Sequence, residues 1–225
     1  SGDTPTHPEL LDWLATELIS NGWRIKPIIK TIMMSTTYRQ ASRRESLAVA
    51  EPNPRAVDPG NRLLWRARLR RLESEVIRDA MLAVAGRLDP MAAGPPVKDF
   101  TKLRRSLYVQ TARWKRSSYA MMFDAANPDT STEKRTVSTI APQALLLLNH
   151  PFVLEQAGHL AKRLIKDVPH DDVNRIHRAY QLLFGRRATD GDIRIARQVI
   201  AAGSDSGWQD WAHVLLCSNE FIYVD

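Results

Sequence analysis

Apolar residues recur every three or four positions along most of this chain, and this spacing is the feature that most restricts its fold. Such spacing places apolar side chains on one face of an α-helix, whereas a half-buried strand needs them at every second position. The clearest case runs from Glu73 to Leu88, where Ile77, Met81 and Val84 lie on one stripe. The pattern therefore predicts a mainly α fold.

Turn residues divide the end of the chain into three helical segments. We expect Asp171 or Asp172 to cap the first segment and Gly185 to end it. The run Thr189-Asp190-Gly191-Asp192 resembles a capping box that opens the second. Three helices of similar length with short connections predict an antiparallel helical bundle over residues 171–225.

Strand signals are scarce by comparison. Only Arg105–Arg113 shows an alternation, in which Leu107 and Val109 take turns with Tyr108 and Gln110. We therefore expect at most one short two-stranded β element.

The organisation of the chain follows from its length and its first residues. The 225 residues, 44% of them apolar, are enough for one sizeable core or two small ones. Ser1 and Gly2 are typical of a cloning remnant, so residues 1–5 are expected to lie outside the fold. Residues 6–170 are expected to form a helical domain with long polar loops, on which residues 171–225 pack as one unit. Thr6-His7-Pro8-Glu9 resembles a capping box at the first helix.

A polar loop that precedes an apolar helix is the place where function is most expected. The loop, Phe123–Ser138, is rich in turn formers, and Ile140–Asn149 is an apolar run that predicts a buried helix with Thr139 as its N-cap. Asp124 and Asp129 are the candidate catalytic pair, since glycoside hydrolysis uses two facing carboxylates. The alternatives are a cation site and a loop in which the acids pair with Arg135.

A basic region is the second candidate for function. The chain has a formal net charge of +7, and residues 43–116 hold 17 Lys and Arg against 8 Asp and Glu. Arginines interleaved with aromatic residues can bind sugars, anionic groups or single-stranded nucleic acid. The other interpretation is that the aromatic residues belong to the core and the arginines form salt bridges. Across the loop and this region, the candidate ligand-binding residues are Arg105, Tyr108, Arg113, Trp114, Arg135, Ser138, Thr139 and Gln143.

Several kinds of site have no motif in this sequence. Cys217 is the only cysteine, so neither an internal disulfide nor a Cys-x-x-Cys-His haem attachment is present. There is no His-Glu-x-x-His zinc motif, no Gly-x-Ser-x-Gly elbow and no glycine-rich phosphate loop. No apolar run approaches the roughly 18 residues of a membrane span, and no signal peptide is visible. We therefore expect no metal and no cofactor in this chain.

Several segments arrive together in an order that resembles a known family. The segments are HPELLDWLATELISNGW, DPGNRLLW, RRLESEVIRDAMLAVAGRLD, RRSLYV, FDAANPD, STIAPQALLLLN and LLCSNEFIYVD. Together they resemble the C-terminal domain of unknown function of large exported planctomycete-type proteins, and the resemblance extends from Thr6 to Asp225. In that family the domain follows another domain of unknown function, often with a c-type haem segment further upstream.

The resemblance implies a setting rather than a reaction. It implies an extracytoplasmic location, upstream domains on the same polypeptide as partners, and a c-type haem only in that upstream part. The family's motif falls on Phe123, Asp124, Arg135, Ser138, Thr139, Pro142, Gln143, Leu145 and Asn149. The family often has a cysteine before the arginine, whereas this chain has Ser131, Thr132 and Glu133 there, so a cysteine-based role is unsupported.

The sequence thus predicts a binding or architectural module, the C-terminal part of a larger exported protein, which docks on its upstream domain or on an anionic glycan. One alternative is a polysaccharide hydrolase that uses the loop carboxylates. The other is nucleic-acid binding, which an exported location disfavours, through a basic aromatic cluster formed by Arg104, Arg105, Tyr108, Arg113, Trp114, Lys115, Arg116 and Tyr119.

Overall fold

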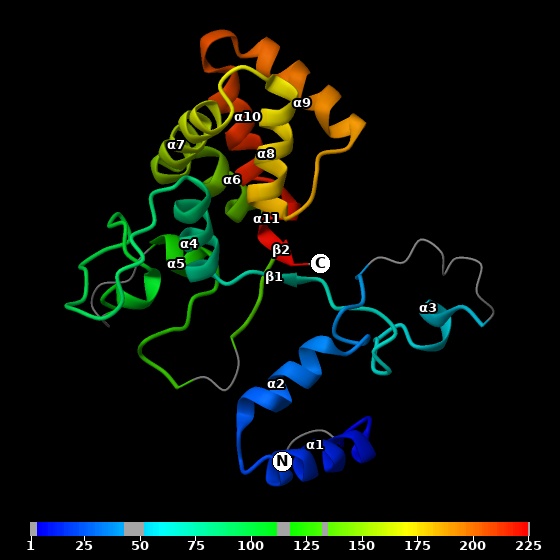
Figure 1. Ribbon diagram of the computed structural model, residues 1–225. Helices are drawn as coiled ribbons and strands as arrows, with labels where there is room; N and C mark the ends of the chain where they lie inside the picture. Colours follow the sequence, from blue (N-terminus) through cyan, green and yellow to red (C-terminus); the bar gives the residue numbers. More distant parts are fainter. Residues whose placement is uncertain (1–3, 43–51, 112–117, 132–134, 225) are drawn as a thin grey trace. The chain divides into compact units, whose positions relative to one another are not determined.

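The structure, a computed structural model, describes residues 4–42, 52–111, 118–131 and 135–224. The chain divides into two units, Ser1–Arg70 with Asp225, and Arg71–Val224. In the part that is described, the fold is 56% helical, with eleven helices and one short two-stranded antiparallel sheet (Figure 1). The prediction of a mainly α fold is confirmed.

The first unit contains the helices α1 (Pro8–Ser20), α2 (Ile25–Met34) and α3 (Pro54–Val57). The predicted capping box at Thr6 is wrong: His7 is the N-cap of α1, and no side chain caps the helix. Gly22 follows α1 with a φ of 64°, which lets the chain turn sharply into α2. We call α1, α2 and the turn between them, residues 8–34, the helical hairpin.

The second unit holds all the longer helices except α1 and α2. Its elements are β1 (Arg70–Arg71, at the boundary), α4 (Ser74–Val84), η2 (Ser106–Tyr108), α5 (Ser118–Met122), α6 (Ala141–Asn149), α7 (Pro151–Asp167), α8 (Asp172–Phe184), α9 (Asp190–Ala202), η3 (Ser204–Ser206), α10 (Gly207–Leu216), α11 (Asn219–Ile222) and β2 (Tyr223–Val224).

The core of the second unit lies along α7. Its buried residues Val153, Leu160 and Leu164 join those of α4, α8 and α10 in one cluster. Helix α10 packs on α7 and α9, and α8 packs on α7 and α9 as well. Gly207 begins α10 against the backbone of Ile200 in α9, where a Cβ would clash. Two predicted helix boundaries are also present, because Thr189 and Asp192 form a capping box that begins α9 and Gly185 ends α8 at a φ of 69°.

The predicted strand over residues 105–113 is wrong for Ser106–Tyr108, and Val109 forms a single parallel β-bridge with Val97. Ser106–Tyr108 form a single 3₁₀ turn, in which Tyr108 N donates to Arg105 O over 2.9 Å. Both the amide and the hydroxyl of Ser106 donate to the carboxylate of Asp79 in α4. These bonds use the groups that an extended strand would present to a neighbour. The sheet forms instead between β1 and β2, segments at opposite ends of this unit.

The prediction that residues 140–149 form a buried helix is only half right. The helix is present as α6, but Ile140 rather than Thr139 is its N-cap, and only Gln143 and Leu147 are buried. Contacts with α5 and α7 cover one side of α6. Leu145 and Leu148 are exposed, and Leu146 is partly buried against the core cluster.

Candidate functional site

Hydrogen bonds among four residues join the two ends of the polar loop. We call these residues, Arg71, Asp124, Ser138 and Gln143, the loop clasp. Arg71 Nη2 donates to Asp124 Oδ2 over 2.7 Å. The backbone N of Ser138 donates to the same oxygen over 2.8 Å, and the Ser138 hydroxyl donates to Oδ1 over 2.9 Å. Gln143 Nε2 donates to Met122 O over 3.0 Å and to Ser138 O over 3.2 Å. Three candidates predicted from the sequence therefore meet here, together with one that was missed.

The backbone conformation of Asp124 and the negative charge of its carboxylate both fix the side chain in this position. It follows α5 with a φ of 57°, a conformation that Asp tolerates better than most residues. Burial alone would raise the pKa of Asp124, but the hydrogen bonds from Ser138 and the charge of Arg71 lower that pKa below its ordinary value. Asp124 is therefore a stably ionised carboxylate whose oxygens are already occupied.

Arg71 is the member of the loop clasp that the sequence did not indicate. Its guanidinium lies over the ring of Phe123, 5.6 Å from the centroid, and Nη2 also donates to Phe123 O. Its Nε and Nη1 are buried and have no hydrogen-bond partner among the described residues. Arg71 stands in a run of arginines, and nothing in that run distinguishes a buried arginine from an exposed one.

Arg135 connects the loop to the first turn of α4. Its Nη1 lies 2.9 Å from Glu75 Oε2 and its Nη2 lies 3.1 Å from Glu75 Oε1, a two-pronged ion pair. Nη1 also lies 3.2 Å from Glu73 Oε2. Burial alone would raise the pKa of Glu75, but the bonds from Arg135 and Ser74 lower that pKa below its ordinary value. The sequence interpretation paired Arg135 with the acids of the loop, whereas in the structure Arg135 pairs with Glu73 and Glu75 and the loop acid Asp124 pairs with Arg71.

The other loop candidates do not join this group. Asp129 is exposed, and its backbone N donates to Asn127 Oδ1 in a local turn. Thr139 is also exposed, and its hydroxyl lies 3.2 Å from the hydroxyl of Tyr223. The structure therefore gives Asp124 and Asp129 different surroundings.

The basic aromatic cluster is partly internal. The guanidinium of Arg104 lies over the ring of Tyr108, 4.0 Å from the ring centroid. The hydroxyl of Tyr108 accepts a hydrogen bond from Ala93 N over 2.8 Å. Arg104 in turn donates to Pro95 O over 2.5 Å. Arg105 is exposed, and Arg113 and Trp114 lie outside the described residues.

Arg78 is a second buried arginine that sequence reasoning missed. It donates to Phe100 O over 2.8 Å, to Arg104 O over 3.0 Å and also to Lys102 O. Its charge is balanced by Asp79 at 2.9 Å. Because burial removes water from the guanidinium, the pKa of Arg78 is lowered from its ordinary value. Arg78 thus holds residues 100–106 against α4 and serves a structural role.

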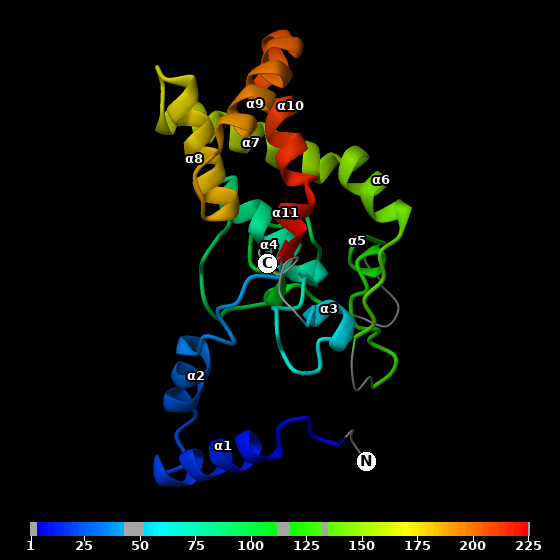
Figure 2. The ribbon, with the colours of Figure 1, turned by 90° about the vertical axis from the view of Figure 1, so that its right-hand side faces the viewer.

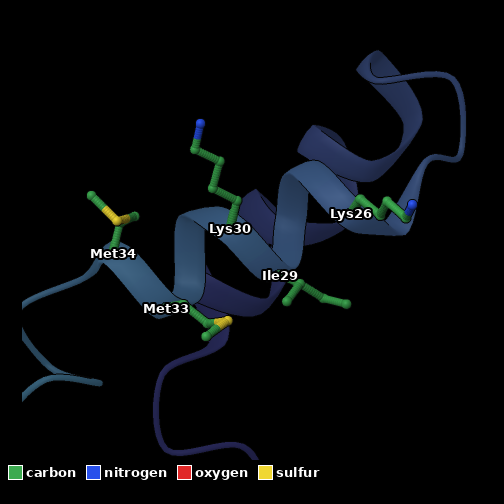
Figure 3. Close-up of a pocket in the computed structure, with 5 residues that line it drawn as sticks. All are labelled: Lys26, Ile29, Lys30, Met33 and Met34. Carbon is green, nitrogen blue, oxygen red and sulfur yellow. The ribbon is translucent and has the colours of Figure 1, made fainter.

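The helical hairpin carries a different kind of surface. Neither α1 nor α2 has a buried residue, and large apolar side chains on both are exposed: Leu10, Leu11, Trp13, Ile19, Trp23, Ile25, Ile29, Ile32, Met33 and Met34. On α2, the residues Lys26, Ile29, Lys30, Met33 and Met34 line a shallow groove of about 320 Å³ (Figure 3). The sequence signalled the start of the first of these helices but did not indicate that the apolar residues of the hairpin are exposed.

Within the described residues, no three His, Cys, Asp or Glu side chains gather so that they could hold a metal ion. No described helix is long and apolar enough to cross a membrane. These findings leave two features for a functional argument: a polar loop that is closed by its own ion pairs, and an apolar helical hairpin.

The fold and these features define a mainly helical chain with a helical hairpin that carries exposed apolar side chains. The family described as "PSD1: Protein of unknown function (DUF1553)" matches residues 1–200, and the chain belongs to this family. Neither the curated proteins nor the solved structures gave a match.

Proposed function

We propose that this chain is a docking module that attaches to a protein partner through the helical hairpin. The observation that carries the proposal is that neither α1 nor α2 has a buried residue. Soluble proteins rarely expose large apolar patches unless these patches bind something. The loop clasp then has a supporting role: it stabilises the unit to which the hairpin is attached.

The length of the two helices strengthens this argument. α1 has 13 residues and α2 has 10, and isolated helices of such length are only marginally stable in water. Helices in proteins gain most of their stability by packing an apolar face against another element. A partner that covers Ile25, Ile29 and Met33 would supply that packing.

The hydrolase alternative is less well supported by the carboxylates. A glycosidase needs one carboxylic acid whose pKa is raised, so that it can donate a proton near neutral pH. The pKa of Asp124 is shifted in the opposite direction, and its oxygens are bound by Arg71 and Ser138. Asp124 is therefore a poor general acid, and this favours a binding role over catalysis.

Binding to an anionic glycan or to nucleic acid also has little support from the aromatic residues. Stacking on a sugar or a base needs an open ring face. One face of Tyr108 is covered by Arg104, and its hydroxyl is already bound to Ala93 N. We therefore favour a protein partner over an acidic polymer.

The wider setting is proposed on the resemblance described above. It places this module at the C-terminal end of a larger exported polypeptide, with upstream domains and any c-type haem on the same chain. An antibody against this chain would test the setting, by detecting the native protein in fractionated cells. Detection outside the cytoplasm, on a polypeptide much longer than this chain, is the expected result, and a short cytoplasmic product would contradict it.

The docking function can be tested by oxidising methionines with hydroxyl radicals. Met33 and Met34 of the hairpin are 52% and 65% exposed, and Met91 and Met121 of the other unit are 51% and 48% exposed, so the second pair is a matched control. We expect Met33 and Met34 to be oxidised several-fold more slowly in cells that produce the protein naturally than in the dilute purified chain. The change in the oxidation rates of Met91 and Met121 measures how the cellular environment alone slows oxidation. Equal rate ratios for both pairs would contradict the proposal.

A further inference from the structure

The hairpin separates its charges by sign. Among the described residues up to Met34, the acidic side chains are Glu9, Asp12 and Glu17, all on α1. The basic ones are Arg24, Lys26 and Lys30, at the start of α2 and along it. The hairpin thus offers an acidic helix and a basic helix, each with exposed apolar residues.

This separation is not used within the hairpin. No ion pair joins α1 to α2 in the part of the chain that the structure describes, and Glu17 Oε2 accepts instead from Asn21 Nδ2 over 3.3 Å. In both views α2 leaves α1 at a wide angle, so the two helices run apart from the turn (Figures 1 and 2). The charged side chains of the hairpin are exposed except for Glu17, which is half-buried, so they are available to whatever covers the hairpin.

The arrangement of residues on each helix is complementary. On α1, Glu9, Trp13 and Glu17 follow one another at intervals of four, which places an exposed aromatic ring between two carboxylates on one face. On α2, Lys26 and Lys30, also four residues apart, line the groove together with Ile29, Met33 and Met34 (Figure 3). An exposed ring between two acids is complementary in charge to a groove whose lining includes two bases.

We propose that a second copy of this chain covers the hairpin, with Trp13 of each copy in the α2 groove of the other. A two-fold interface brings each surface into contact with its counterpart twice, so acidic α1 would lie on basic α2 on both sides. This inference rests on the proposed docking function and names its partner. An anionic lipid surface or polyanion would attract α2 but repel the carboxylates of α1.

The first test is the oligomeric state of the purified full chain, measured by sedimentation over a range of concentrations. We expect a dimer that Trp13→Ala weakens by roughly tenfold or more, the scale of a central aromatic anchor. Trp23→Ala is the matched control, because Trp23 is an exposed tryptophan in the turn and lies outside the groove. A chain that is monomeric at every concentration would overturn the proposal, and so would a dimer that is insensitive to Trp13→Ala.

Charge reversal tests the pairing and does not depend on one variant that could misfold. Glu9→Lys with Glu17→Lys makes α1 basic overall, so that both helices of the hairpin are basic. Lys26→Glu with Lys30→Glu makes α2 acidic, so that both helices are acidic. This second variant leaves α1 acidic, as it already is, and changes only α2. Each double variant alone should dimerise poorly, whereas an equimolar mixture should form a heterodimer as tight as the original dimer. A mixture that stays monomeric would contradict the pairing of α1 with α2.

The competing occupant is tested with vesicles that contain phosphatidylglycerol. Cosedimentation of the chain with these vesicles, combined with a monomeric chain in solution, would overturn the proposal in favour of a lipid surface. The result is also separable from the docking function. If Met33 and Met34 are protected in cells but the purified chain is monomeric, the docking function stands and only the second copy is wrong.

Discussion

Arg71 and Asp124 lie 53 residues apart in the sequence, yet their side chains meet in an ion pair of 2.7 Å. The Arg71 side chain is 3% exposed and that of Asp124 is 16% exposed. Because this pair has so little access to water, removal of one partner would leave the other charge buried without compensation and would destabilise the fold. This pair closes the loop that precedes α6.

Replacement of Asp124 by alanine should therefore destabilise the chain strongly. We expect Asp124→Ala to lower the free energy of unfolding by about 3 kcal/mol, since Arg71 would remain buried without its counter-charge. Urea unfolding followed by circular dichroism measures this change. Asp205→Ala, at an exposed acid of η3, is the control and should have little effect. Equal stability of the two variants would show that the ion pair contributes nothing.

The contact between Arg135 and Glu75 should be measurable by a double-mutant cycle. Arg135→Ala and Glu75→Ala are each expected to destabilise the fold, with a coupling energy of about 1 kcal/mol, because the pair is two-pronged but partly exposed. High salt should reduce this coupling, since exposed charges are screened. Arg135→Ala combined with Asp205→Ala should be additive. A coupling near zero would mean that Arg135 does not fasten the loop to α4.

Two substitutions in α6 distinguish its buried side from its exposed side. Leu147→Ala should cost about 3 kcal/mol, because Leu147 lies in the core cluster and its removal leaves a cavity. Ala144→Asp should change stability by about 0.5 kcal/mol or less, because Ala144 is exposed. Thermal unfolding of both variants gives the comparison. A large loss from Ala144→Asp would indicate that this face of α6 is covered.

The contrast in α6 shows how far a sequence of this kind can be interpreted. Helices were predictable because their signals are local: the spacing of apolar residues, the capping box at Thr189 and the glycine at Gly185 all act within a few residues. A continuous apolar run such as residues 144–148 does not carry a periodicity that selects one face. Which of its leucines is buried depends on where α5 and α7 pack.

The candidate site was predictable only in part, for a related reason. Asp124, Ser138 and Gln143 were found because they lie close together along the chain and form one closed loop. Arg71 and Arg78 were missed because Asp124 and the carbonyl groups that Arg78 binds lie more than 20 residues away, and nothing local marks a buried arginine. The segment at Ser106 was taken for a strand because its bond to Asp79 is equally remote in sequence.

Arg78 provides a direct test of these long-range contacts. Arg78→Met keeps much of the volume but leaves the carbonyl oxygens of Phe100 and Arg104 without their donor, so we expect a loss of about 4 kcal/mol. Arg197→Met, at an exposed arginine of α9, should be close to neutral. Hydrogen exchange of residues 100–106 would locate the effect. Unchanged protection of that segment would show that Arg78 does not hold it.

The capping box of α9 should make part of the stability depend on pH. Burial alone would raise the pKa of Asp192, but hydrogen bonds from Arg186 and Thr189 lower it to about 2. Because the unfolded value is about 3.9, the carboxylate stabilises the fold at pH values above that, and the stabilisation is lost as the pH falls through the folded pKa. At neutral pH it contributes about 2 kcal/mol, of which about half should remain at pH 3.

The variant Asp192→Asn tests this prediction. The difference in free energy of unfolding between it and the original chain should be largest near pH 7 and should shrink as the pH falls from 5 to 3. Urea unfolding at a series of pH values measures the difference. Asp190→Asn is the matched control, because Asp190 lies in the same first turn and is exposed, so only its weak interaction with the helix dipole is removed. A difference that is independent of pH would mean that the lost contacts are not those of an ionised Asp192.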